Sequence, residues 1–164
     1  MTLTATAIRL APRLHEDRPD AMAVWFERQL RSPGQSMPPQ DARRVPQMRR
    51  LVAARLRLCG LFELVEPMML VTSELVTNAL QYGDGPGVSL LLSCSGKSVR
   101  LTVDDGSQQC PQMRSTHAEA ESGRGLCIVS MVASEYSGSW GVSSDHTQTW
   151  CLLTARASGR GTGV

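Results

Sequence analysis

The sequence is poor in net charge, in aromatic residues and in long apolar runs, and these shortages exclude several classes of protein. It contains no run of about eighteen apolar residues, the length that a membrane-spanning helix needs. Residues 1–30 lack the basic start, apolar centre and small-residue cleavage site of a signal peptide. The net charge of +2 is too small to require nucleic acid as a partner. We therefore expect a soluble, cytoplasmic protein with no membrane partner.

The sequence also lacks any Cys-x-x-Cys pair. Its five cysteines are odd in number and widely spaced, which argues against a zinc site or a disulfide framework and favours reduced, core-like thiols. Cys110 differs because it falls in a polar segment, where either a reactive thiol or an ordinary loop residue is compatible with the sequence. The three histidines follow no metal-ligand spacing, so we assign them no chemistry.

What is present suffices for one domain, because 164 residues with 41% hydrophobic residues can bury a single core. We expect an N-terminal extension and linker at residues 1–39, with a helix around residues 20–30. The adjacent Trp25 and Phe26 leave two alternatives open for it, a poorly ordered tail or an arm that docks on a partner. The domain itself is expected at residues 40–156, and the Gly- and Ser-rich residues 157–164 are expected to form a disordered tail.

Apolar periodicity within the domain predicts three helices and four strands. Helices are expected at 41–59, 65–82 and 123–134, and strands at 88–94, 98–103, 136–143 and 148–155. Pro46 fits only the first turn of its helix, so that helix should begin near Arg44. Helices on one face of a mixed, largely antiparallel sheet make an α/β (α+β) two-layer sandwich.

The first of these helices carries six arginines between Arg43 and Arg57. They could contact phosphates, which keeps an arginine-rich nucleic-acid-binding module as an alternative. No interleaved aromatics, helix-turn-helix spacing or zinc pattern accompanies them. A solvated face, or one that meets an acidic protein, explains them better.

Glu74 and Asn78 are four residues apart on the second expected helix, so they project from the same face. An Asn carbonyl is a hard oxygen ligand of the kind that Mg²⁺ accepts together with waters and substrate phosphates. A neighbouring carboxylate can orient or deprotonate an attacking hydroxyl. Taken alone, the pair is equally compatible with an ordinary solvated helix face.

Two further segments supply groups suited to a nucleotide. Asp105 and Gly106 follow an expected strand, where a carboxylate can accept a hydrogen bond from an exocyclic amine and a glycine lets the backbone approach a flat ring. Gly123, Arg124 and Gly125 precede an expected helix, whose N-terminal amides favour an anion. Each segment alone could be an ordinary turn or helix cap.

In this order and at these intervals, the three segments resemble those of the histidine-kinase-like ATPase superfamily. The closest resemblance is to its bacterial, actinobacterial-type anti-sigma factor serine/threonine kinases. Residues 74–83 resemble the N box of that family, residues 103–111 its first glycine box and residues 123–126 its second. The resemblance covers about residues 40–156 and implies the fold of that superfamily.

The resemblance implies roles for individual residues. Asn78 would bind Mg²⁺ and Glu74 would act as the base or orient the nucleophile, while Asp105 would recognise the adenine amine with Gly106 beside it. Three residues at the end of a lid through residues 107–122 would flank the triphosphate: Gly123, Arg124 and Gly125. Thr149, on the last strand, would lie near the adenine end of the pocket.

Three departures from the family pattern bear on catalysis more than on fold. Tyr82 stands near the end of the N box, the first glycine box has one glycine rather than two, and residues 145–148 replace a Gly-rich turn. ATP binding and phosphoryl transfer are therefore separate questions for this chain.

The resemblance implies ATP and Mg²⁺ as cofactors. It implies a transcription regulator that binds a sigma factor and phosphorylates a serine or threonine on an anti-sigma factor antagonist. Two alternatives stay open: an interaction module without kinase activity, and the arginine-rich nucleic-acid-binding module, which is less favoured. The identity of the sigma factor and antagonist, and whether the chain forms a homodimer, do not follow from the sequence.

Overall fold

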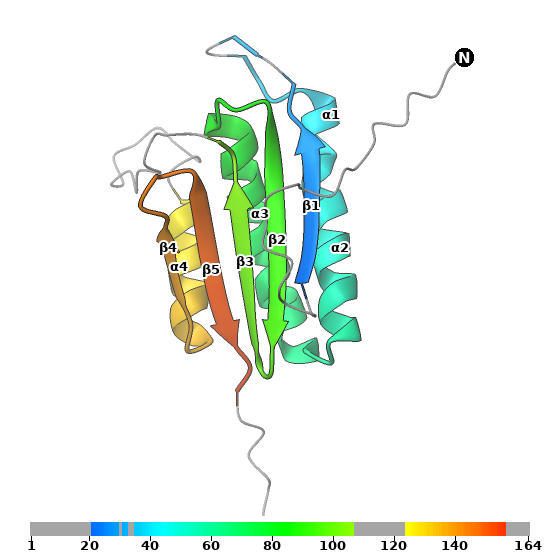
Figure 1. The fold of residues 1–164 in the computed structure, drawn as a ribbon, viewed down its shortest axis with the longest axis vertical. Helices are drawn as coiled ribbons and strands as arrows, with labels where there is room; N and C mark the ends of the chain where they lie inside the picture. Colours follow the sequence, from blue (N-terminus) through cyan, green and yellow to red (C-terminus); the bar gives the residue numbers. More distant parts are fainter. Residues whose placement is uncertain (1–20, 30, 33–34, 107–123, 157–164) are drawn as a thin grey trace, which may run out of the picture.

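The computed structural model describes residues 21–29, 31–32, 35–106 and 124–156. This part of the chain contains five strands, four α-helices and one short 3₁₀ helix (Figure 1). In chain order they are β1 (Ala21–Glu27), α1 (Pro39–Ala42), α2 (Arg44–Leu58), the 3₁₀ helix (Phe62–Leu64), α3 (Val65–Tyr82), β2 (Gly87–Ser95), β3 (Ser98–Asp104), α4 (Gly125–Glu135), β4 (Ser139–Val142) and β5 (Gln148–Thr154).

The five strands form one sheet in the order β1-β2-β3-β5-β4. Helices α2, α3 and α4 cover one face of it (Figure 1), so the two-layer α+β sandwich expected from the sequence is confirmed. Every pairing between the described strands is antiparallel, and the parallel part of the expected mixed sheet is not found among them.

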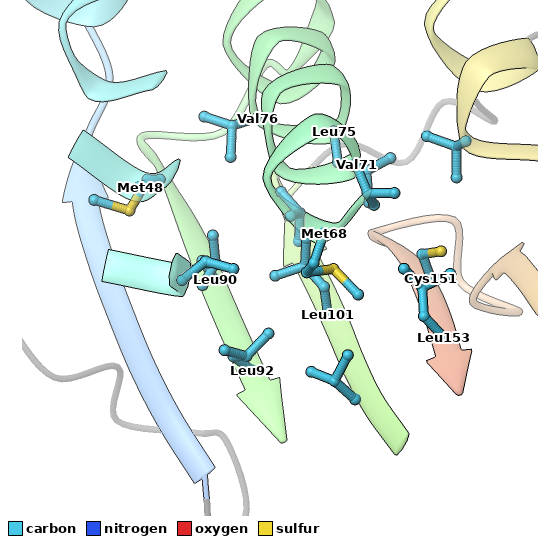
Figure 2. Packing of buried hydrophobic residues seen from close by; sticks show 14 of the residues in the cluster. Met48, Met68, Val71, Leu75, Val76, Leu90, Leu92, Leu101, Cys151 and Leu153 are labelled. Carbon is cyan, nitrogen blue, oxygen red and sulfur yellow. The ribbon is translucent and has the colours of Figure 1, made fainter. Parts of the chain in front are cut away.

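The hydrophobic core lies between the sheet and the three long helices, with α3 at its centre (Figure 2). Helix α3 contacts both α2 and α4 and also lies against β2, β3 and β5. Its side chains Met68, Val71 and Leu75 pack over the central strands, which contribute Leu90 and Leu101 (Figure 2). A polar group on α3 is satisfied locally, because the buried Thr72 hydroxyl donates to the Met68 carbonyl at 2.7 Å. This anchored helix is the support of the site described below.

The helix expected around residues 20–30 is wrong, because Ala21–Glu27 form the edge strand β1. Val24 and Phe26 are buried in the core, whereas Trp25 between them points to the other face, which is the alternation of a strand. Pairing with β2 over its whole length places β1 in the sheet. The division at residue 40 therefore does not hold for β1, and Phe26 serves the core rather than a partner.

The other expected elements lie close to their predicted positions. Helix α2 begins at Arg44 with Pro46 in its first turn, and α3 has the predicted bounds. The hairpin of β2 and β3 turns at Gly96, whose φ of +57° suits glycine. The tail expected at residues 157–164 lies outside the described residues. No helix in the described ranges combines the length and the apolarity that crossing a membrane requires.

Candidate nucleotide site

Helix α3 carries Glu74 and Asn78 along one border of its buried face. The neighbouring Leu75 and Ala79 are buried, while Glu74 and Asn78 are only partly exposed. This follows from the helical repeat, since a border position shares its turn with the core yet reaches past it. The two side chains therefore lie beside the interface at which α3 and α4 pack against each other.

The N-terminus of α4 approaches both side chains at Gly125. A Cβ atom added to Gly125 would lie 2.7 Å from Oε2 of Glu74 and 3.4 and 3.5 Å from the amide nitrogen and oxygen of Asn78. Gly125 is buried, so this close approach belongs to the interior of the site. Any larger residue would compete with the Glu74 carboxylate for the same space. The structure thus brings Glu74, Asn78 and Gly125 together, as predicted.

Arg124 precedes Gly125 at the N-cap position of α4 and is exposed. No side chain of the described residues caps this helix start. A helix N-terminus with an adjacent guanidinium favours a bound anion. Gly123 and residues 107–122, where the lid and Cys110 were expected, lie outside the described residues.

The second part of the site lies where β3 ends. The Asp105 amide donates to the Thr147 carbonyl at 3.3 Å, which joins this loop to the turn before β5. A Cβ added to Gly83, just after α3, would lie 2.9 Å from Cβ of Asp105. Gly106 has a φ of +68°, and its amide donates to Oδ1 of Asp104 at 2.9 Å. Cβ of Asp105 therefore lies beside the C-terminal end of α3.

Thr149 lies at the same end of the sheet as Asp105. It pairs with Val103 on β3 and with Val142 on β4, and directly paired residues share a face of the sheet. Val103 is buried beneath the helices, so Thr149 also faces the helical layer. The predicted residues Asp105, Gly106 and Thr149 thus gather at one end of the sheet, next to the end of the helix that carries Asn78.

The Glu74 carboxylate is partly enclosed by the surrounding residues. Burial raises the pKa of Glu74, because the partly enclosed carboxylate loses solvation when it is charged. A carboxylate with a raised pKa is a stronger proton acceptor than one in open solvent. The arrangement can accept a proton from a hydroxyl group held between Glu74 and the N-terminus of α4.

The side chains at this place also fit Mg²⁺. The described residues hold no group of three or more His, Cys, Asp or Glu side chains that would form an all-protein metal site. Mg²⁺ differs from zinc in this respect, since it keeps several waters and binds through one or two protein oxygens plus phosphates. Asn78 and Glu74 supply such oxygens beside Gly125, whose missing side chain leaves room for the Glu74 carboxylate.

Sequence reasoning missed two contributors to this region. Gly83 was only the last residue of a motif, although its lack of a side chain lets Asp105 approach α3. A glycine directly after a long helix was a usable signal. Arg28 is the other contributor, and its Nη2 donates to the Gly85 carbonyl at 2.7 Å. The two residues are 57 positions apart, and no local pattern pointed to this contact.

Comparison with known proteins agrees with this geometry. The family model for the histidine kinase-like ATPase domain matches residues 38–151, which is more than half of the chain. The chain therefore belongs to the histidine kinase-like ATPase family, and an ATPase-type domain of this family binds ATP. Strand β1 precedes the matched segment and completes the sheet from outside it. No curated protein matches the chain in a sequence comparison.

Proposed function

We propose that this chain is an ATP-dependent serine/threonine protein kinase that acts as an anti-sigma factor. In this proposal it binds a sigma factor and phosphorylates a serine or threonine on an anti-sigma factor antagonist protein. The family supplies the ATPase-type domain. The resemblance of residues 74–83, 103–111 and 123–126 to the anti-sigma factor kinases supports the finer assignment.

One observation carries the catalytic part of this proposal. The carboxylate of Glu74 and the amide of Asn78 both lie against Gly125, at the start of a helix that no side chain of the described residues caps. A proton acceptor, an oxygen ligand and a helix N-terminus at one point are the groups that phosphoryl transfer requires, because that reaction depends on positioning and charge stabilisation.

Each residue then has a distinct task. Asn78 would hold Mg²⁺ through its amide oxygen, and Glu74 would accept the proton of the serine or threonine hydroxyl. Arg124 and the amide of Gly125 would bind phosphate oxygens at the N-terminus of α4. When bound, Mg²⁺ neutralises charge on the phosphates.

The adenine ring would be recognised at the end of the site away from the phosphates. Asp105 would accept a hydrogen bond from the adenine amine, with Gly106 beside the ring and Thr149 on the adjoining strand. Gly83 allows this because it leaves room for Asp105 next to α3. The adenine end is thus built from loop and strand residues, whereas the phosphate end is built from helix residues.

Calorimetry of ATP binding tests the nucleotide site first. We expect Mg²⁺-dependent binding by the wild-type chain and its loss in Asp105→Asn. Asp84→Asn is the matched control, because Asp84 is an exposed acid on the preceding turn and its change should leave ATP binding intact. Absence of ATP binding by the wild-type chain would reduce the protein to a module that acts by protein contact alone.

Transfer is tested separately with labelled ATP, a sigma factor and a candidate antagonist from the same cell. Glu74→Ala should abolish labelling of the antagonist while ATP and partner binding persist, since Glu74 lies at the phosphate end only. Labelling that survives in Glu74→Ala would remove the role assigned to this carboxylate. The same mixture with double-stranded DNA tests the arginine-rich alternative, which predicts salt-dependent binding instead.

A further inference from the structure

A second hollow lies on the other side of the α3 C-terminal end from α4. It has a volume of about 450 Å³ and lies between the segment that follows β1 and the turn after α3. Its described lining is mostly polar and includes Arg28, Arg31, Ser36 and Gln81. Sites for small molecules commonly have volumes of this order. None of these residues has a part in the proposed nucleotide chemistry.

Arg28 is the unusual member of this lining. Its side chain is 9% exposed, and a buried guanidinium needs partners for its N–H groups. Its Nη2 donates to the Gly85 carbonyl at 2.7 Å, yet its Nε has no hydrogen-bond partner within the described residues. A buried donor without a partner is costly, so the described residues satisfy this guanidinium only in part.

Arg31 brings a second guanidinium to the same hollow. Its Nη2 donates to the carbonyls of Leu80 and Gln81, at the last turn of α3. These bonds fix the position of the guanidinium, which reduces the entropy lost when the group binds a ligand. Neither Arg28 nor Arg31 forms an ion pair with a carboxylate of the described residues.

The charges around the hollow do not balance. The carboxylate of Asp41 is attracted by Arg28, Arg31 and Arg44, and both of its oxygens accept from the Gln29 amide at 3.3 Å. Among the described residues that line the hollow, Arg28 and Arg31 are positively charged and the exposed Asp84 is the one acid. The described lining therefore carries an excess of positive charge.

We propose that this hollow is a binding site for an oxyanion, a phosphate or carboxylate group of a small molecule, held by the guanidinium groups of Arg28 and Arg31. The fork of an arginine matches such groups with two parallel hydrogen bonds. Ser36 and Gln81 supply further polar groups for the rest of the ligand. Gly83 lines the hollow and also lies against Asp105, so the hollow adjoins the end of β3.

The test follows the Nε–H signal of Arg28 by ¹H–¹⁵N correlation spectroscopy while inorganic phosphate, and separately malonate, is added to the full chain. Chloride at equal ionic strength is the reference. The buried Nε–H gives a resolved signal, and saturable displacement of that signal by either oxyanion, but not by chloride, is the expected result. Phosphate acting better than malonate identifies a phosphoryl ligand, and the reverse identifies a carboxylate.

Variants locate the binding. Arg31→Gln should weaken it about tenfold or more, the typical effect of losing a charged hydrogen bond. Arg49→Gln removes the same charge from the exposed face of α2 and should have no effect. Should Arg31→Gln fail to fold, Arg31→Lys retains the charge without the fork and should weaken binding less. An unmoved Arg28 signal overturns the proposal. So does binding that is lost in Arg124→Gln and kept in Arg31→Gln, because that places the phosphate at α4.

Discussion

Replacement of Gly125 by alanine separates catalysis from stability in this protein. The new Cβ would lie 2.7 Å from Oε2 of Glu74, whereas ordinary contacts begin at 3.4 Å. The Glu74 carboxylate must therefore retreat by at least the difference, 0.7 Å (3.4 minus 2.7). The backbone can keep its place, because the obstructing atom is the far end of a flexible side chain.

The expected loss of activity follows from that displacement. A misplacement of about 1 Å in a catalytic arrangement costs roughly a hundredfold in rate, so we expect phosphoryl transfer to fall by about ten- to a hundredfold. Stability should change little, because Gly125 is the first residue of α4 and the closest contact of the new methyl group is the flexible end of the Glu74 side chain. Transfer rates and urea unfolding of the same preparation measure both effects.

A double-mutant cycle checks the cause. If Gly125→Ala acts by displacing the Glu74 carboxylate, it should have a smaller effect on transfer in a Glu74→Asp background, where the carboxylate is shorter by one methylene. Equal losses in both backgrounds would refute the reasoning, because the alanine would then act on Arg124 or on the helix itself. A drop in unfolding free energy would also refute it, since the structure gives the new methyl group a flexible neighbour.

Four further predictions concern titration and packing. The raised pKa of Glu74 means that the folded state holds this proton more tightly than the unfolded chain does, so the unfolding free energy falls as pH rises from the ordinary pKa of a glutamate through the raised one. Glu74→Gln should therefore stabilise the protein at neutral pH and not below the ordinary range of a glutamate. Urea unfolding at several pH values measures this difference. Because Glu74 must be charged to accept a proton, transfer by the wild-type chain should decline on acidification through the same raised pKa. Leu101→Ala empties a fully buried position on β3 and should cost about 2–5 kcal/mol of unfolding free energy; a cost under about 1 kcal/mol would contradict the packing in Figure 2. Burial raises the pKa of the Cys151 thiol to about 12, so alkylation at pH 8 should be slow in the native protein and fast in guanidinium chloride.

Elements with a local signal could be predicted from the amino-acid pattern alone. Helix α3 was predicted with its observed bounds, because its apolar residues repeat with the helical period over eighteen residues. That same repeat placed Glu74 and Asn78 on one face. The hairpin of β2 and β3 followed from two apolar runs around Gly96. The order of the motifs then indicated the family before any contact between them was known.

Features that depend on residues far apart in the sequence could be seen only in the folded structure. Residues 20–30 contain good helix formers, yet Ala21–Glu27 form a strand because β2, far along the chain, offers a complete ladder of hydrogen bonds. The contact of Gly125 with Glu74 and Asn78 arises from the packing of α4 on α3. The bond from Arg28 to Gly85 spans 57 residues. Such contacts are set by the burial of the whole core, which no local pattern of residues encodes.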